Sequence, residues 1–413
     1  MSKCQSRSNE RRFARALAIA GCVMVAAGLD LASPRAAADP PALIGLDGVG
    51  GHDSPSYIAK HIDLIESRPF DGIIINEYLG RNLFSSNIKK DAPTQVDPST
   101  GAITYEAAAR DLSVLKGAFK RFHHNFVKVN LAMAGPPPAL TDDAGWKAVE
   151  ASAENFARAV RETGLEGIFF DNEVYFRAKL PGTDKPSDYW LYEHQLALSA
   201  RTAQQLPLDA ANQLSRRRGR EFILAVVRGF PNVVFMTSHS PVEGCGTWKT
   251  MTGHFSHDHY LSGAFIGGIV EEISDPAKFV DGGEDYDFRT PHDFAFARAW
   301  RKGEPGGSSG SITRLDGPSK CPFMDQRLAS IWQKRVSIAF STFDKARVKP
   351  GGDYAPISNV AEFESTLTNA MRASDAYAWH YAQWQDWWGD TTDAQLGPWI
   401  EAIKRARAAA DRK

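Results

Sequence analysis

The residues best suited to catalysis in this chain follow a short apolar run. Residues 167–170 (GIFF) are succeeded directly by Asp171, Asn172 and Glu173. Because side chains alternate between the two faces of a strand, a strand here places both carboxylates on one face. Acids at the end of a buried strand are costly unless they are solvated, paired or used in chemistry. The pattern therefore predicts a catalytic edge that contains Asp171 and Glu173.

The chain around this stretch alternates short apolar runs with longer amphipathic ones, which is typical of a β/α protein with a parallel sheet. We expect strands at residues 42–47, 71–79, 126–132, 167–173, 232–237, 278–281, 335–343 and 377–383. Eight such strands predict an α/β fold of the (β/α)8 type, a TIM barrel with long βα loops. One domain would span residues 39–413. An open doubly wound sheet is the alternative, and the first strand lacks the Gly-rich loop typical of dinucleotide-binding examples.

Active sites of such barrels lie where the strands end, so the polar residues at those ends are candidates. They are Asp47, Glu77, Asn130, Asn172, His239, Glu284 and Asp344. Helix caps that follow strands also favour Asp, so Asp47 and Asp344 equally suit caps or loop anchors. We expect Asp47, Glu77, Asn130, Asn172 and His239 to contact a substrate.

The pair Asn172-Glu173, at the end of the expected fourth strand, resembles the clan A (β/α)8 glycoside hydrolases. The resemblance implies that Glu173 is the acid/base and that Asn172 binds the sugar hydroxyl beside the reacting carbon. Clan A places its nucleophilic Glu after strand seven, whereas that strand ends here in Asp344, and Glu284 follows strand six. The Asp-X-Glu spacing of Asp171 and Glu173 is also similar to chitinase-type barrels. The second carboxylate is therefore Glu284 or Asp344.

These patterns predict an exported glycoside hydrolase that acts on an oligo- or polysaccharide. Glu173 would protonate the leaving oxygen, and Glu284 would be the nucleophile or second base. Asp171 would raise the pKa of Glu173, because a like charge nearby keeps an acid protonated. The separation of the two carboxylates decides between retention and inversion.

Aromatic residues crowd the C-terminal part of the chain, where residues 377–388 read YAWHYAQWQDWW. Trp384, Trp387 and Trp388 lie beyond the expected eighth strand, in a loop. We expect at least one of them to stack on a sugar ring, with Trp384 as the first candidate. Tyr286 is a weaker candidate for the same role.

Two rival functions use other features. His254, His257, Asp258 and His259 could ligate zinc in a metal-dependent hydrolase, although their spacing does not match a metallo-β-lactamase. The other rival is a carbohydrate-binding barrel without turnover. No Gly-X-Ser-X-Gly elbow follows a strand, so a serine nucleophile is not indicated, and we expect no cofactor.

The N-terminus resembles an export signal. Arg11 and Arg12 precede an apolar run at residues 16–29, and small residues lead to Ala38, after which we expect cleavage. The predicted location is secreted or periplasmic. A competing resemblance is a lipoprotein box that ends at Cys22, which would then carry a lipid anchor.

Two cysteines lie in the expected mature chain, Cys245 and Cys321. In an oxidising compartment they would form a disulfide or remain two independent thiols. The formal net charge is -1, which does not indicate a nucleic-acid partner. The basic residues 216–218 suit a solvated helix end. No segment after the N-terminal signal has the length of apolar residues that a membrane span needs.

Overall fold

The computed structural model describes most of the chain after its N-terminal segment. The described residues are 40–48, 50–85, 88–91, 93–132, 135–174, 178–179, 186–187, 189–199, 206–240, 260–284, 288–302, 323–344, 357, 359–383, 385–389 and 391–411. They belong to one compact unit, Pro40–Lys413. The export signal with Cys22, the residues 254–259, Cys245, Cys321, Tyr286 and Trp384 lie outside the described residues.

The centre of this unit is a parallel sheet of nine strands in the order β10-β11-β1-β2-β3-β4-β7-β8-β9. The strands are β1 Ala42–Asp47, β2 Gly72–Asn76, β3 Phe126–Ala132, β4 Gly167–Val174, β7 Val234–Thr237, β8 Lys278–Asp281, β9 Val336–Ile338, β10 Phe340–Asp344 and β11 Tyr377–Ala382. A separate antiparallel pair joins β5 Ala178–Lys179 to β6 Pro186–Ser187. The parallel order follows the chain, as a singly wound β/α protein requires.

One segment closes the sheet into a barrel. β9 and β10 are separated only by Ala339; β9 pairs with β8, whereas β10 pairs with β11. The backbone N–H of Ala339 donates a hydrogen bond to the carbonyl of Asp281 at 2.8 Å, so the ladder continues across the break. Residues 336–344 thus form one barrel strand that bonds to both ends of the sheet. The eight-stranded barrel expected from the sequence is confirmed, and the open sheet is excluded.

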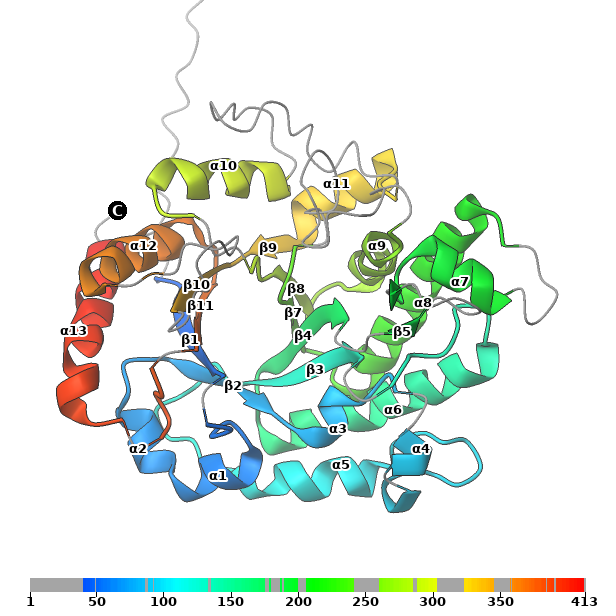
Figure 1. Cartoon of the computed structure of the whole chain (residues 1–413), viewed down its shortest axis with the longest axis horizontal. Coiled ribbons are helices and arrows are strands. Elements are labelled where there is room, and N and C mark those ends of the chain that lie inside the picture. Colours follow the sequence, from blue (N-terminus) through cyan, green and yellow to red (C-terminus); the bar gives the residue numbers. More distant parts are fainter. Residues whose placement is uncertain are drawn as a thin grey trace, which may run out of the picture. The chain divides into compact units, whose positions relative to one another are not determined.

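Helices surround these strands (Figure 1). They are α1 Pro55–Lys60, α2 Ile62–Ser67, α3 Tyr78–Arg81, α4 Ile88–Asp91, α5 Tyr105–Leu112, α6 Asp143–Thr163, α7 Tyr192–Ser199, α8 Leu208–Gly229, α9 Ser262–Glu272, α10 Pro291–Lys302, α11 Gln326–Arg335, α12 Val360–Ala373 and α13 Asp393–Ala410. Within the described part of the chain, none of them combines the length and apolar character that crossing a bilayer would take.

The longer helices begin and end where the sequence supplies caps. The carboxylate of Asp142 accepts a hydrogen bond from the N–H of Gly145 and so caps the first turn of α6. The helix ends at Gly164, whose φ of 87° lies in the left-handed region that glycine tolerates best. Between these caps, Trp146 and Phe156 lie on the buried stripe that packs against the sheet.

Apolar side chains fill the inside of the barrel. Ile44, Phe126, Phe169 and Trp379 belong to one buried cluster contributed by alternate strand positions. The indole N–H of Trp379 donates to the carbonyl of Gly282 at 2.8 Å, and its ring lies 5.1 Å from that of Phe169. Since the interior is packed, a substrate can meet the strand residues only at the two ends of the barrel, and active sites of (β/α)8 enzymes lie at the carboxyl end.

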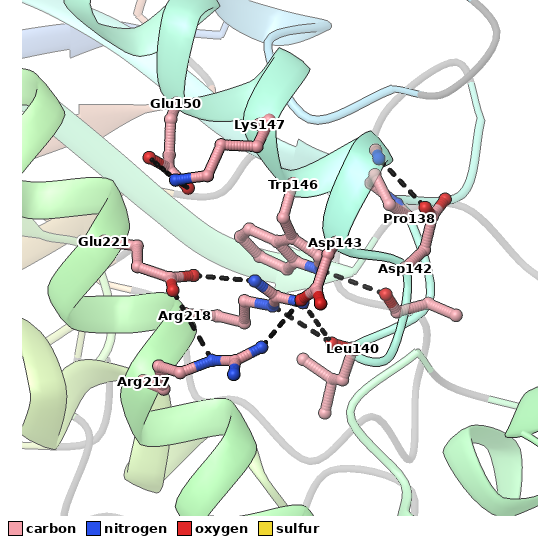
Figure 2. A network of polar contacts seen from close by, with 12 residues as sticks. Pro138, Leu140, Asp142, Asp143, Trp146, Lys147, Glu150, Arg217, Arg218 and Glu221 are labelled. Atoms are coloured by element: carbon pink, nitrogen blue, oxygen red, sulfur yellow. Dashed lines mark hydrogen bonds and ion pairs between the residues drawn. The ribbon is translucent and has the colours of Figure 1, made fainter. Parts of the chain in front are cut away.

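A polar network fixes the loop between β3 and α6 against α8 (Figure 2). The guanidinium group of Arg218, on α8, donates two hydrogen bonds to the carbonyl of Leu140, at 2.9 and 3.0 Å. It also pairs with Asp143 and with Glu221, the latter at 2.7 Å. Only 1% of the Arg218 side chain is exposed. The expectation of a solvated helix end at residues 216–218 is therefore wrong for Arg218, because its charge is buried and paired.

Candidate active site

The candidate site lies where four neighbouring strands end. β3, β4, β7 and β8 are consecutive in the sheet, so side chains from their carboxyl ends meet at one edge. Phe169 faces the barrel interior, and the alternation along β4 therefore directs Asp171 and Glu173 inward as well. His239 follows β7, and Glu284 follows β8.

His239 joins two of these carboxylates. Its Nε2 lies 3.2 Å from Oε1 of Glu173 and 3.3 Å from Oε2 of Glu284. The strand order explains this position, because β7 lies between β4 and β8. The two carboxylate oxygens share one nitrogen neighbour, so they are no further apart than the sum of these distances, about 6.5 Å.

Asp171 is the most heavily bonded carboxylate of the site. Its Oδ2 lies 2.7 Å from Nζ of Lys128 and accepts a hydrogen bond from the amide of Asn130 at 2.9 Å. Its Oδ1 accepts from the backbone N–H of Glu173 at 3.2 Å and from the hydroxyl of Ser238 at 3.4 Å. These bonds fix the position of the Asp171 carboxylate beside Glu173.

Lys128 is a member of the site that the sequence analysis missed. It occupies the middle of β3, in the same inward phase as Phe126, and only 15% of its side chain is exposed. Burial lowers the pKa of Lys128, but the charge and hydrogen bond of Asp171 outweigh it, so the pKa is raised above its ordinary value. A charged residue on the interior face of an otherwise apolar strand was the signal that could have identified it.

Glu284 has the most perturbed carboxyl group of the site. Its backbone N–H donates to the carbonyl of Ser238 at 2.8 Å, which extends the pairing of β7 with β8. Burial raises the pKa of Glu284 to about 8, and the negative charges of Glu173 and Asp171 add to the effect. His239 and Lys128 oppose it. A buried carboxyl group beside a second one is the arrangement from which general acids are made.

Asn172 and Asn130 both bond to other residues of the edge. The carbonyl oxygen of Asn172 accepts from the backbone N–H of His239 at 3.0 Å and from the hydroxyl of Ser238 at 3.1 Å. Asn130 donates to Asp171 and is 2% exposed. Both amides therefore orient the catalytic candidates, His239 in one case and Asp171 in the other.

Three further candidates point away from this edge. Asp47 accepts from the backbone N–H groups of Trp387 and Trp388, at 3.1 and 3.3 Å, and Glu77 caps α3 by accepting from Gly80 at 2.7 Å. Asp344 accepts from the N–H of Gln383 at 2.6 Å. Each follows an inward-facing residue by one position, so alternation turns it to the helix side of the barrel. The structure gives all three the role of loop or helix anchors and does not bring them to Glu173.

The aromatic loop after β11 is largely buried. Trp387 and Trp388 are 1% and 0% exposed, and their rings lie 5.1 and 5.3 Å from that of Phe70. Neither presents a face on which a sugar could stack, so of the three tryptophans only Trp384 keeps that expectation, and Tyr286 keeps it as the weaker candidate.

Tyr381 is a second inward-facing residue that the sequence analysis did not single out. Its hydroxyl accepts from the amide of Gln383 at 2.9 Å, and its ring stacks on Phe343 at 5.4 Å. Burial raises the pKa of Tyr381, as do the nearby charges of Glu284 and Asp171. The Tyr381 ring also requires a glycine at position 48, because a Cβ atom on residue 48 would lie 2.8 Å from the ring. The phenol therefore faces the same edge as the carboxylates.

A cavity of about 440 Å³ lies at the other end of the barrel. Its lining includes Glu166, Val234 and Lys278, which stand at the amino ends of β4, β7 and β8. It is thus remote from the carboxylate edge. Among the residues with described positions, no group of three or more His, Cys, Asp or Glu side chains is arranged to hold a metal ion.

Comparison with protein-family models and with curated proteins finds no match. Similar solved structures include an exo-beta-1,4-mannosidase from Opitutaceae bacterium strain TAV5 (11% identity, 90% of this chain and 60% of that chain, TM-score 0.44). A GH5_18 protein from Streptomyces cattleya, solved with GlcNAc, is 12% identical over 91% of this chain and 80% of that one, with TM-score 0.44. A D-psicose 3-epimerase from Clostridium cellulolyticum is 11% identical over 89% and 96%, with TM-score 0.36. The chain is an α/β barrel that these similarities assign to no family.

Proposed function

We propose that the protein is a glycoside hydrolase that uses Glu173 and Glu284 as its pair of catalytic carboxylates. The observation that carries this proposal is the position of both groups within 3.3 Å of His239 Nε2 at the carboxyl end of the barrel. Hydrolysis of a glycosidic bond requires two carboxyl groups that face each other, one protonated and one ionised. Burial supplies the protonated one, because it raises the pKa of Glu284 to about 8.

The raised pKa favours Glu284 as the acid that protonates the leaving oxygen and Glu173 as the nucleophile. This exchanges the roles expected from the sequence. Glu173 as nucleophile makes the proposed reaction a retaining one. The two oxygens nearest His239 lie no more than about 6.5 Å apart; a separation of ~5–5.5 Å between the carboxyl groups would fit retention, and ~6.5–9.5 Å would fit inversion. In the described arrangement His239 occupies the space between the carboxylates, so a bound sugar would replace at least one of its two contacts.

The test uses Glu173→Gln and Glu284→Gln with a panel of aryl glycosides of different leaving-group acidity. Both variants should lose activity on natural-type substrates by about a thousandfold or more. Glu284→Gln should still release phenols that leave without protonation, in a burst that leaves the glycosyl-enzyme to be hydrolysed slowly for want of a base, whereas Glu173→Gln should show no burst. Added azide should restore turnover to Glu173→Gln and yield the glycosyl azide of inverted configuration.

Three results would count against the proposal. Full activity of Glu173→Gln on a substrate that the parent cleaves would exclude the pair. Activity that disappears on chelation would favour the metal-dependent alternative, and sugar binding without any released reducing end would favour a binding barrel. Glu401→Gln is the matched control, because Glu401 is an exposed glutamate on α13 with 56% of its side chain accessible.

We also propose that the protein is exported, which rests on the N-terminal sequence alone. N-terminal sequencing of protein from the producing cell should begin after Ala38. A lipid-modified Cys22 at the N-terminus would instead identify a lipoprotein, and an intact Met1 would contradict export.

A further inference from the structure

Lys128 is the one lysine described at the edge where Glu173 and Glu284 meet. It enters from β3, next to β4 in the sheet, and its Nζ lies 2.7 Å from Oδ2 of Asp171. The Asp171 side chain is 2% exposed, so the pair is largely shielded from water. A buried pair of this kind persists only where further hydrogen bonds satisfy both groups, as Asn130 and Ser238 do for Asp171.

The ion pair excludes one chemistry for Lys128. A lysine that forms a Schiff base must be neutral and therefore needs a lowered pKa. Burial alone would lower the pKa of Lys128, but Asp171 outweighs burial and raises it. The ammonium group therefore remains charged at neutral pH, and its effect on neighbouring groups is electrostatic.

The titratable and charged groups that face this ammonium come from every element around it. Asp53 before α1, Asp171 on β4, Glu284 after β8 and Tyr381 on β11 act on it, and His239 joins Glu284 to Glu173. Arg81 of α3 is a further cation, and it acts on Asp53.

We propose that Lys128 is a positioning residue of the active site, which, held by Asp171, supplies the fixed positive charge that keeps the Glu173–Glu284 pair at a single shared proton. The catalytic role of Lys128 rests on the proposed function, whereas the titration that tests the effect of its charge can be measured without a substrate. Lys128 opposes the rise in the pKa of Glu284, and Asp171 promotes it, so the two halves of the ion pair act in opposite directions.

This opposition gives a test that a merely structural role would not pass. Lys128→Met removes the positive charge and should move the titration of Glu284 to higher pH by about one unit. Asp171→Asn leaves Lys128 without its anion and should move the same titration to lower pH. Lys128→Arg keeps the charge and should restore the parent titration. The carboxyl carbons are followed by NMR of protein labelled with ¹³C at glutamate Cδ, with Glu173→Gln and Glu284→Gln assigning the signals.

Shifts in the same direction in Lys128→Met and Asp171→Asn, or no shift in either, would overturn the inference. Lys120→Met is the control for removal of a lysine, because 78% of the Lys120 side chain is exposed and it should leave the titration unchanged. Circular dichroism and thermal unfolding verify that each variant is folded. If the titrations move as expected while no glycoside is hydrolysed, the role of Lys128 stands and the proposed function fails.

Discussion

Carboxyl groups with similar burial have different donors around them in this protein. Asp171 and Glu77 are both almost inaccessible, at 2% and 1%. Asp171 has a lysine, an amide and a hydroxyl beside it, whereas Glu77 has the backbone N–H of Gly80. Burial raises the pKa of Glu77 to about 7, although hydrogen bonds from the backbone of Leu79 and Gly80 lower it. Among the described residues, no cation is one of the main groups that lower the pKa of Glu77, so burial dominates its ionisation.

Glu77 makes the stability of the fold depend on pH. The folded pKa of about 7 exceeds the ordinary value of 4.5, so the folded state binds this proton more tightly than the unfolded state does. The stabilisation is complete below pH 4.5 and is lost as the pH rises through 7. Glu77→Gln, which keeps an acceptor for Gly80, should therefore raise the free energy of unfolding at pH 8 by at most about 3 kcal/mol.

The measurement is urea unfolding of the parent and of Glu77→Gln at pH 5 and pH 8. The gain should be smaller at pH 5, where the parent group is mostly protonated. An equal effect at both pH values would show that ionisation is not the cause. Glu106→Gln, an exposed position on α5, should show no such dependence.

The residues of the edge were only partly accessible to sequence reasoning. The motif at Asp171 and Glu173 stands out because charge interrupts an apolar strand, and strand alternation correctly gives both the same face. The same alternation, applied to Leu46 and Asp47, would have turned Asp47 to the helix side. The pairing of Lys128 with Asp171 was hidden, because the two residues lie 43 positions apart in the chain and such pairing depends on strand register that sequence alone leaves undetermined.

Among the elements, α6 and α8 show how a barrel fixes its loops. The loop between β3 and α6 ends at Leu140, whose carbonyl is held by Arg218 of α8. Arg218 and its neighbour Arg217 both contact Asp143, yet Arg218 is 1% exposed and Arg217 is 44% exposed. The two arginines are therefore a matched pair for measuring what burial adds to an ion pair.

Arg218→Met should lower the free energy of unfolding by about 3 kcal/mol, because it leaves the buried carbonyl of Leu140 without its donor and removes the contacts with Asp143 and Glu221. Arg217→Met should cost less than about 1 kcal/mol, as expected for an exposed pair. Guanidinium unfolding of both variants measures the difference. Equal losses would mean that the buried network contributes no more than a surface contact.

The boundaries of the elements were predictable where apolar runs are short and bounded. Residues 42–47 and 278–281 were expected as strands and are observed as β1 and β8. The second strand was expected to continue to residue 79 but ends at Asn76, because the carboxylate of Glu77 caps α3 instead. A capping hydrogen bond to a residue three positions ahead competes with the strand there, and hydrophobicity alone does not register it.

In the whole molecule, closure of the barrel depends on the segment 336–344. Arg301, which is fully buried, donates from Nη1 to the carbonyl of Ala339 at 3.0 Å and lies 4.6 Å from the centre of the Phe340 ring. The guanidinium group thus supports the point at which the strand changes partners between β8 and β11. The seventh strand was expected as one run, and its division at Ala339 follows from this change of partner.

Arg301→Met should loosen the closure without unfolding the rest of the barrel. In the parent, the amides of β9 and β10 should exchange with solvent only through global unfolding. In Arg301→Met they should exchange at least about tenfold faster than the amides of β3 and β4, which hydrogen-exchange mass spectrometry resolves. Lys334→Met, an exposed change on neighbouring α11, should leave the pattern unaltered. Uniform acceleration across all strands would indicate general destabilisation instead.

The segment 336–344 lies late in the chain, and this position governs when the barrel can close during synthesis. When a ribosome has released residues as far as Asp281, six barrel strands can pair, but β1 and β8 each present a row of unsatisfied backbone groups. The edge of β8 stays exposed until β9 has been made, and that of β1 until β11 has been made. The unpaired strand edges of the unfinished chain can pair with those of other nascent copies. Productive folding therefore depends on protecting these edges until the remaining strands have been made.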